Sequence, residues 1–236
     1  MLREISGPTG RLEALLDVPA QTHGVTSGGL TELGQSLVGV RAAVVVGHPH
    51  PQLGGTMHTK AVYQTAKALA RIGCAALRFN FRGVGLSAGT YDQGMGEQDD
   101  FLAALDFMTA RYPDTPMWAA GMSFGSWVGL TVGARDPRVS ALIGIAMPLA
   151  RYDFSAIQDS PKPKFFVHGD RDDITSLRAV RAFYAKSAEP KELAVIDDAD
   201  HVFDGRVGEV GDALEELLAD WPDAARGVSL NSRHRM

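Results

Sequence analysis

Hydrophobic positions along the chain follow two alternating patterns. Short, continuous apolar runs predict strands that are buried on both faces of a sheet, and such runs lie at 41–47, 75–81, 117–121, 139–147, 164–168 and 193–196. Between them, apolar residues recur at helical spacing, which predicts helices at 57–72, 97–111, 126–134, 175–187 and 207–219. Strands that alternate with helices favour an α/β fold, with a mostly parallel sheet and helices on both of its faces.

The two ends of the chain depart from this alternation. Residues 2–6 and 11–18 flank a Gly-Pro-Thr-Gly turn and predict a hairpin. Residues 20–36 are rich in glycine, threonine and serine and lack periodicity, so we expect an extended connection there. The tail, residues 224–236, is predicted to be poorly ordered. Because no repeat or linker interrupts the rest, residues 1–223 are expected to form one domain.

One pentapeptide, Gly-Met-Ser-Phe-Gly at 121–125, stands where a predicted strand turns directly into a predicted helix. This context is typical of a nucleophile elbow. A one-residue turn strains the backbone, and a Cβ at either glycine position would collide with neighbouring elements. The turn would hold the Ser123 hydroxyl above the sheet edge, next to N–H groups of a helix N-terminus that favour negative charge. The alternative is an ordinary strand-to-helix turn.

A serine nucleophile needs a base to take its proton and a third group to orient that base. In this kind of fold the acid and then the histidine follow the serine, each after a later strand. His201 comes directly after the last predicted strand, and the loop 169–173 follows an earlier one. We favour Asp172 as the acid. Asp170 and Asp173 share that loop, but they could instead cap a turn and begin the next helix.

Two backbone N–H groups should face the negative charge that develops on the substrate. Phe124 directly follows the nucleophile and is expected to supply one of them. The other should come from the loop 48–55, after the early strand. The two prolines of that loop have no N–H, so His50 is the favoured donor and Leu53 the reserve.

Two further motifs indicate weaker alternatives. His48 and His50 form an H-x-H pair, but no Cys, His or carboxylate cluster completes a metal site around them. The glycine-rich segment 83–89 is similar to a dinucleotide fingerprint, but another loop separates it from the next predicted helix. We therefore expect neither a metal nor a cofactor. The acidic residues of 97–100 are explained by a helix N-terminus, where the helix dipole favours negative charge.

Taken together, five motifs carry a resemblance to a known family. They are HPHPQLGGTM (48–57), RFNFRGVGLSAGTYDQGMGEQDD (78–100), GMSFG (121–125), HGDRDD (168–173) and DADHVF (198–203). Over about residues 40–220 the chain resembles the α/β-hydrolases, specifically the small, nearly lidless cytoplasmic hydrolases related to dienelactone hydrolase. The resemblance implies an α/β-hydrolase fold with about eight mostly parallel strands and a triad of Ser123, Asp172 and His201. Dienelactone hydrolase has a cysteine nucleophile, so its substrate is not carried over.

The expected function is hydrolysis of small carboxylic esters through an acyl-enzyme intermediate. Residues 148–163 are too few for a helical lid domain, so we expect an open site. Apolar residues are expected to wall it: Met122, Phe124, Met147, Leu149 and Phe203. A thioesterase, a small-peptide hydrolase or an acyltransferase would use the same triad, and a non-catalytic binding protein could keep the same fold.

Composition narrows the possible partners and the cellular location of the protein. The chain has 236 residues, of which 45% are hydrophobic, which suits a sizeable core. Its net charge of −5, with no basic stripe, argues against nucleic-acid and anionic-membrane partners. The N-terminus lacks the apolar core of a signal peptide, no apolar run approaches the length of a membrane span, and Cys74 is the single cysteine. We expect a cytoplasmic protein with a small-molecule acyl ester as its substrate; its oligomeric state stays open.

Overall fold

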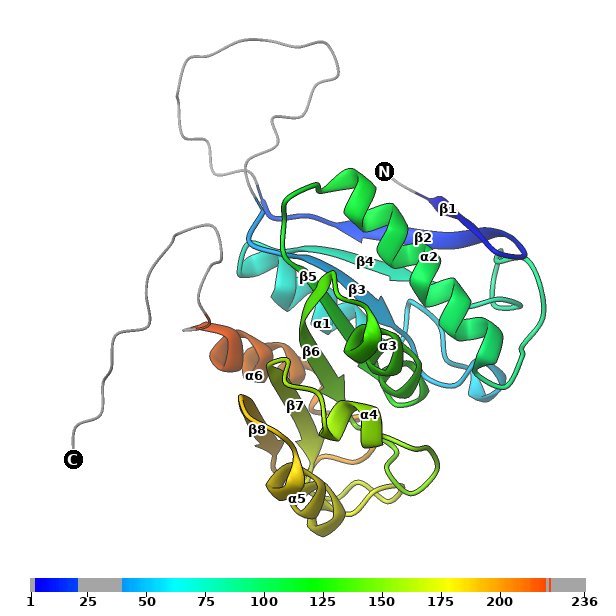
Figure 1. Cartoon of the computed structure of the whole chain (residues 1–236). Coiled ribbons are helices and arrows are strands. Elements are labelled where there is room, and N and C mark those ends of the chain that lie inside the picture. The colour runs from blue at the N-terminus through cyan, green and yellow to red at the C-terminus, as the bar shows by residue number, and fades with distance from the viewer. Residues whose placement is uncertain (1–2, 21–39, 220, 222–236) are drawn as a thin grey trace, which may run out of the picture.

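A computed structural model describes residues 3–20, 40–219 and 221, which form an eight-stranded sheet covered by helices (Figure 1). In space the strands follow the order β1-β2-β4-β3-β5-β6-β7-β8. Their bounds are β1 Glu4–Gly7, β2 Gly10–Asp17, β3 Ala43–Gly47, β4 Ala75–Phe79, β5 Met117–Met122, β6 Val139–Ile145, β7 Lys164–Gly169 and β8 Lys191–Ile196.

Strand direction divides the sheet into two parts. β1 and β2 form an antiparallel hairpin, and β2 is antiparallel to β4. From β4 to β8 every neighbouring pair is parallel. β3, β4, β5 and β7 are buried along their whole length, which is why they are continuous apolar runs in the sequence. The predicted α/β-hydrolase architecture, a mostly parallel sheet of eight strands, is confirmed.

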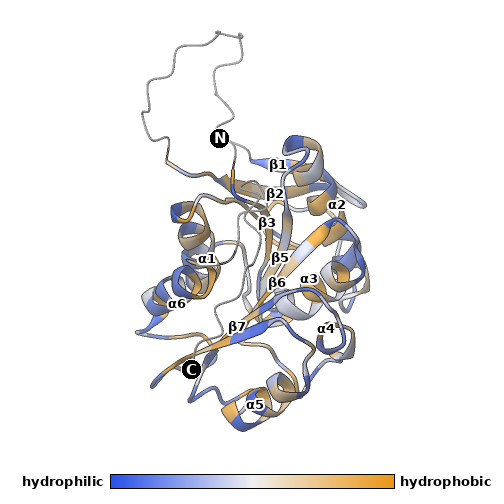
Figure 2. Cartoon of the chain, turned by 60° about the vertical axis from the view of Figure 1, so that its left-hand side comes forward, coloured by the Kyte–Doolittle hydropathy of each residue, from blue (hydrophilic) through white to orange (hydrophobic). Residues whose placement is uncertain are grey.

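Helices cover both faces of the sheet. Figure 2 shows α1 and α6 on one face and α2, α3 and α4 on the other. Alternate residues of one strand enter the two cores: Val44 packs with the α1 and α6 side and Val45 with the α2 and α3 side. The bounds are α1 Lys60–Arg71, α2 Met95–Arg111, α3 Phe124–Arg135, α4 Ser155–Gln158, α5 Leu177–Lys186 and α6 Val207–Ala219.

Several predicted boundaries shift because side chains bind backbone groups at the element ends. The helix expected from Met57 begins only at Lys60, because the backbone of Thr59 before it is not helical, with ψ 130°; the N–H of Met57 donates to Asn80 Oδ1 at 2.8 Å. α5 begins at Leu177 because the hydroxyl of Ser176 accepts from the N–H of Ala179. The cap of this helix is therefore Ser176, and the helix-starting role considered for Asp173 is wrong.

The segment between β6 and β7, where a lid domain was considered, is short. Between β6 and β7 the chain forms a single turn of helix, α4, in agreement with the expectation of no lid domain. The extended connection predicted at 20–36, apart from Ala20, and the tail predicted at 224–236 lie outside the described residues. Among the residues described, no helix combines the length and the apolar character needed to cross a membrane.

Candidate active site

The serine of the pentapeptide forms the turn between β5 and α3. Its backbone has φ 53° and ψ −122°, a conformation that non-glycine residues rarely adopt. A Cβ on Gly121 would overlap the backbone of Gly125, and a Cβ on Gly125 would overlap the backbone of Gly47 at the end of β3. Both glycines are therefore required for the close approach of β5, α3 and β3. The carboxyl ends of the parallel strands meet at this edge, where side chains from several loops converge.

Three predicted side chains are linked in one chain of hydrogen bonds. His201 Nε2 lies 2.8 Å from Ser123 Oγ, and His201 Nδ1 lies 2.8 Å from Asp172 Oδ2. The three residues come from the loops after β5, β7 and β8. All three are buried, with at most 9% of each residue exposed. This geometry meets the requirement for a serine hydroxyl beside an oriented base.

The second oxygen of the Asp172 carboxylate is also fully engaged. Oδ1 accepts from the backbone N–H groups of Ile174 and Thr175, both at 2.8 Å. Burial alone would raise the pKa of Asp172, but the hydrogen bonds from His201 and Thr175 outweigh it and hold the pKa below its ordinary value. The carboxylate therefore stays ionised beside His201. Asp170 and Asp173, the other acids of this loop, are exposed.

The two expected oxyanion donors lie on neighbouring elements. Phe124 is the first residue of α3, so its N–H has no acceptor within the helix. The ring of His50, from the loop after β3, lies 5.1 Å from the ring of Phe124. Leu53, the reserve donor, already donates its N–H to the carbonyl of His50 at 3.0 Å. This favours His50 over Leu53.

The loop that carries His50 is anchored by His48, the other histidine of the H-x-H pair. His48 is fully buried. Its Nδ1 lies 2.6 Å from the carbonyl oxygen of Pro49, and its Nε2 accepts from the N–H of Phe81 at 3.1 Å. Burial lowers the pKa of His48 to about 4, so the ring is neutral at pH 7. His48 thus ties the loop after β3 to the end of β4.

The rings of the His48 and His50 pair do not converge on a common point. His50 Nδ1 accepts from the N–H of Gln52, and its Nε2 contacts the hydroxyl of Tyr91. Within residues 3–20, 40–219 and 221, no three His, Cys, Asp or Glu side chains come together as a metal site would require.

The loop after β4 is held by buried charges, and the expected place of the acidic residues at a helix N-terminus is confirmed for Glu97, which forms a capping box at the start of α2. Asp100 accepts two hydrogen bonds from the guanidinium of Arg82, at 3.0 and 2.8 Å. Glu97 is fully buried and accepts from the N–H groups of Asp92 and Gly94. Asp100 therefore binds the loop to α2, a contact for which a general preference for acids at helix N-termini gives no reason. The glycine-rich segment of the loop does not open into a helix, since α2 begins only at Met95.

The apolar walls expected around the site belong largely to the core. Met122, Phe124, Met147 and Phe203 are at most 2% exposed, and only Leu149 keeps a partly exposed surface. Instead, half-buried aromatic residues surround the ring of Phe124. Their rings lie within about 6 Å of it: Tyr91 at 6.0 Å, Trp127 at 5.8 Å and Tyr152 at 5.9 Å. The sequence carried no signal for this cluster, because its members come from three separate segments.

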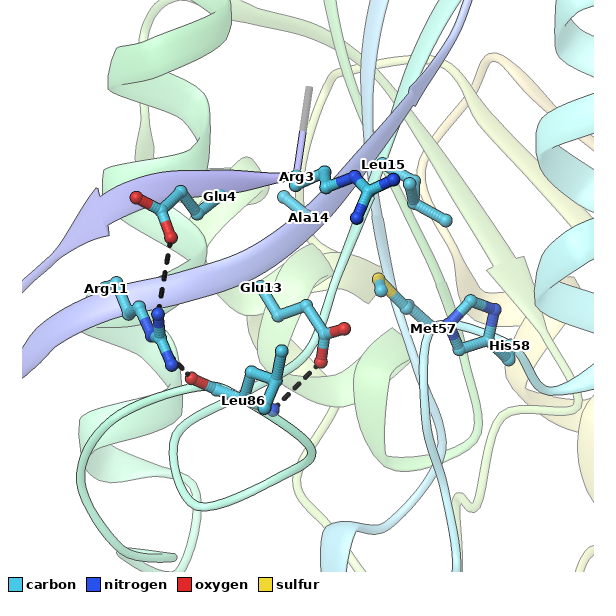
Figure 3. Close-up of a pocket in the computed structure, with 9 residues that line it drawn as sticks. All are labelled: Arg3, Glu4, Arg11, Glu13, Ala14, Leu15, Met57, His58 and Leu86. Carbon is cyan, nitrogen blue, oxygen red and sulfur yellow. Dashed lines mark hydrogen bonds and ion pairs between the residues drawn. The ribbon is translucent and has the colours of Figure 1, made fainter. Parts of the chain in front are cut away.

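A cavity of about 430 Å³ beside β2 contains none of the triad residues (Figure 3). Three of its charged side chains, those of Glu4, Arg11 and Glu13, contact one another or the loop after β4. Arg11 pairs with Glu4 and donates to the carbonyl of Leu86, while Glu13 accepts from the N–H of Leu86. The hairpin therefore supports that loop through Arg11 and Glu13.

The chain is similar to known proteins over most of its length. A family model described as serine aminopeptidase S33, of the Hydrolase_4 type, matches residues 39–157. An uncharacterised protein of Rickettsia prowazekii, RP471, is 34% identical over 180 residues, which cover 72% of this chain and 76% of that protein.

Solved structures agree with this match. A lidless α/β serine hydrolase from Xanthomonas campestris, XC6422, is 33% identical with a TM-score of 0.81, and the alignment covers 94% of each chain. An α/β serine hydrolase homologue from Coxiella burnetii is 35% identical with a TM-score of 0.78, and the alignment covers 91% of this chain and 95% of that one.

Proposed function

The chain belongs to the α/β-hydrolases, within the family described as serine aminopeptidase S33, and we propose that it hydrolyses small carboxylic esters. The observation that carries the proposal is the pair of hydrogen bonds, both of 2.8 Å, that link Ser123 to His201 and His201 to Asp172. In this assignment Ser123 is the nucleophile, His201 the base and Asp172 the group that orients it.

The first half of the proposed reaction forms an acyl-enzyme. Ser123 Oγ attacks the ester carbonyl while its proton moves to His201 Nε2, and the carbonyl oxygen becomes an oxyanion. The N–H groups of Phe124 and His50 donate to that oxyanion. The ionised Asp172 stabilises the imidazolium of His201. As the carbonyl reforms, the C–O bond to the alcohol breaks and His201 gives its proton to the departing oxygen.

The second half releases the acid. Water attacks the acyl carbonyl and transfers a proton to His201 Nε2, so a second oxyanion forms at the same donors. Collapse of this intermediate breaks the bond to Ser123 Oγ, which takes the proton back from His201. The enzyme returns to its starting state, with one ester and one water converted into an acid and an alcohol.

A small-peptide hydrolase is the second candidate, because the matching family is described as a serine aminopeptidase. Such an enzyme needs an accessible carboxylate to hold the ammonium group of its substrate. Glu97 acts electrostatically on His50, but its side chain is fully buried and both oxygens accept backbone N–H groups. It therefore presents no accessible carboxylate to the ammonium group of a peptide, which supports the ester over the peptide.

A substrate panel distinguishes these activities. p-Nitrophenyl esters, acyl thioesters and aminoacyl p-nitroanilides would be compared, with Ser123→Ala as the blank for each. We expect the highest kcat/KM for the esters. Higher kcat/KM for the anilides would favour the peptidase, higher values for the thioesters would favour a thioesterase, and preferred transfer to an added alcohol would indicate an acyltransferase.

The proposal includes the setting of the reaction. We place the enzyme in the cytoplasm, acting on a small-molecule acyl ester as one domain over residues 1–223 and without a nucleic-acid partner. The net charge of −5 supports the last point. If a fluorophosphonate probe fails to label the intact, folded protein, the remaining alternative is a non-catalytic binding protein.

A further inference from the structure

Tyr91, in the loop between β4 and α2, lies beside His50 and beside Phe124, the residue after Ser123. Its hydroxyl lies 3.1 Å from His50 Nε2, and the two ring centroids are 5.1 Å apart. The ring of Tyr91 also lies 6.0 Å from that of Phe124. Tyr91 therefore lies next to both residues assigned as oxyanion donors.

The other nitrogen of His50 determines where the proton lies in this contact. The backbone N–H of Gln52 donates to His50 Nδ1 at 3.2 Å, so Nδ1 carries no proton. Burial lowers the pKa of His50, so the ring is neutral at pH 7. A neutral imidazole has one proton, which must then lie on Nε2. His50 Nε2–H therefore donates to the oxygen of Tyr91.

Among the described residues, this leaves the O–H of Tyr91 with no acceptor. A phenol that accepts one hydrogen bond can still donate another. Burial raises the pKa of Tyr91, so the hydroxyl keeps its proton. In the described part of the chain, the ring of His50 is its sole hydrogen-bond partner. A half-buried donor, polarised by the bond from His50, is thus available beside the loop 48–55.

The strand order decides which part of an ester would meet this donor. His201 follows β8 and Asp172 follows β7, on one side of β5 in the sheet. His50 follows β3 and Tyr91 follows β4, on the opposite side of β5 (Figure 1). Because His201 protonates the alcohol, the alcohol extends toward β7 and β8. The acyl group then extends toward β3 and β4, where Tyr91 lies.

We propose that the Tyr91 hydroxyl is a substrate-binding donor that selects acyl groups with an oxygen acceptor a few bonds from the ester carbonyl. The inference rests on the proposed esterase function. Alkoxy, hydroxy or keto acyl groups would accept this hydrogen bond, whereas a plain alkyl group would place carbon against the O–H. The net gain from one such bond corresponds to about a three- to tenfold advantage in kcat/KM.

Two esters of equal acyl length test this selection: p-nitrophenyl methoxyacetate and p-nitrophenyl butyrate, which differ by an ether oxygen in place of a methylene. Tyr91→Phe keeps the ring and removes the hydroxyl. We expect its kcat/KM to fall about three- to tenfold more for the methoxyacetate than for the butyrate. The intrinsic reactivity of the two esters cancels, because the comparison is between their ratios in two proteins. Tyr63→Phe, a remote change on α1, should leave the ratio unchanged.

The same Tyr91→Phe substitution, made in the His50→Ala protein, distinguishes direct contact of the Tyr91 hydroxyl with the substrate from an indirect effect through His50. His50→Ala removes the ring, and the selective loss on Tyr91→Phe should persist there if the hydroxyl itself contacts the substrate. An equal fall for both esters, or no fall, would overturn the inference, as would disappearance of the selective loss in His50→Ala. Failure of the proposed function is distinguishable, because the parent would then hydrolyse neither ester, whether or not a fluorophosphonate labels Ser123.

Discussion

The loops after β3 and β8 each hold a buried histidine with both ring nitrogens bonded, yet the partners give the two rings different capacities. His201 lies between an ionised carboxylate and a hydroxyl, at 2.8 Å from each. His48 lies between the carbonyl of Pro49 and the N–H of Phe81. A hydroxyl can give up its proton and then accept one, so the ring of His201 can gain a proton and keep both contacts.

His48 has no such freedom. The N–H of Phe81 can only donate, so a proton on His48 Nε2 would break that hydrogen bond. Within the described part of the chain, no carboxylate acts on the ring to stabilise its charge, and burial lowers the pKa of His48 to about 4. The comparison shows that burial and two hydrogen bonds do not identify a base. The charge of the partner on Nδ1 and the chemistry of the partner on Nε2 decide the role.

The strongest test of this difference removes the charge next to His201. Asp172→Asn keeps the shape of the side chain but favours the wrong tautomer of His201, and comparable substitutions cost about 10⁴-fold in kcat. We expect a loss of this order for p-nitrophenyl butyrate hydrolysis, measured at saturating substrate.

The neighbouring acids provide matched controls. Asp170→Asn and Asp173→Asn change exposed carboxylates of the same loop, so each should leave kcat within a few-fold of the parent. If Asp173→Asn were the damaging change and Asp172→Asn were mild, the assignment of the acid would be wrong by one residue.

The next largest effect concerns His48. His48→Leu would leave the carbonyl of Pro49 and the N–H of Phe81 without partners, which should lower the free energy of unfolding by about 3 kcal/mol. Because the loop 48–55 loses its anchor, kcat should also fall, by about 10²-fold if the N–H of His50 no longer donates to the oxyanion. Urea unfolding and ester kinetics measure the two quantities.

His58→Leu is the control for this substitution, since His58 is an exposed histidine in the same connection between β3 and α1. Its unfolding free energy should stay within about 0.5 kcal/mol of the parent. If His48→Leu lost stability but kept full kcat, the loop would not depend on His48 for its catalytic geometry.

A pH series tests the neutral state of His48. Its pKa is about 4 in the folded protein and about 6.5 in the unfolded chain, so the unfolded chain binds a proton that the folded protein does not. The stabilising contribution is therefore complete above pH 6.5 and is lost as the pH falls toward 4, by about 3 kcal/mol.

The measurement is the free energy of unfolding at several pH values in the parent and in His48→Leu, where this group is absent. Other titrating groups contribute to both proteins, so the difference between the two curves isolates His48. The parent curve should fall more steeply between pH 6.5 and 4. Parallel curves would mean that the folded protein tolerates a charged His48.

The two histidines also show how much of the site can be predicted from the sequence. Ser123 and His201 lie in local motifs whose residue types are required by the chemistry, and the strand order brings them together. Asp172 shares its loop with two other acids, and only the folded structure distinguishes the buried one. The contact from His48 to Phe81 spans 33 residues, and no local pattern encodes it.

The same limit applies to the walls of the site. Hydrophobicity identified Met122 and Phe203 as apolar but could not separate a core residue from one at the mouth of a site, and both are core. The hydroxyl of Tyr91 meets His50 across 41 residues, through a loop whose course depends on buried charges such as Asp100. Such contacts follow from the fold rather than from any segment of the sequence.

The smallest predicted effect concerns acyl chain length. α4 is a single turn, so it can cover few methylene groups, each of which gains about 0.8 kcal/mol when it leaves water. We expect kcat/KM for p-nitrophenyl esters to fall beyond roughly six to eight acyl carbons. Better hydrolysis of the dodecanoate than of the butyrate would contradict an open site.

The central claim, that His201 serves Ser123 as a base whereas His48 is structural, is tested most directly by covalent labelling. The protein would be treated with a fluorophosphonate and the modified residue located by peptide mass spectrometry. We predict one adduct, on Ser123, which is absent in Ser123→Ala and strongly slowed in His201→Ala. The His48→Leu variant should still be labelled at Ser123. An adduct on another residue, or ester hydrolysis by Ser123→Ala within tenfold of the parent, would contradict the account.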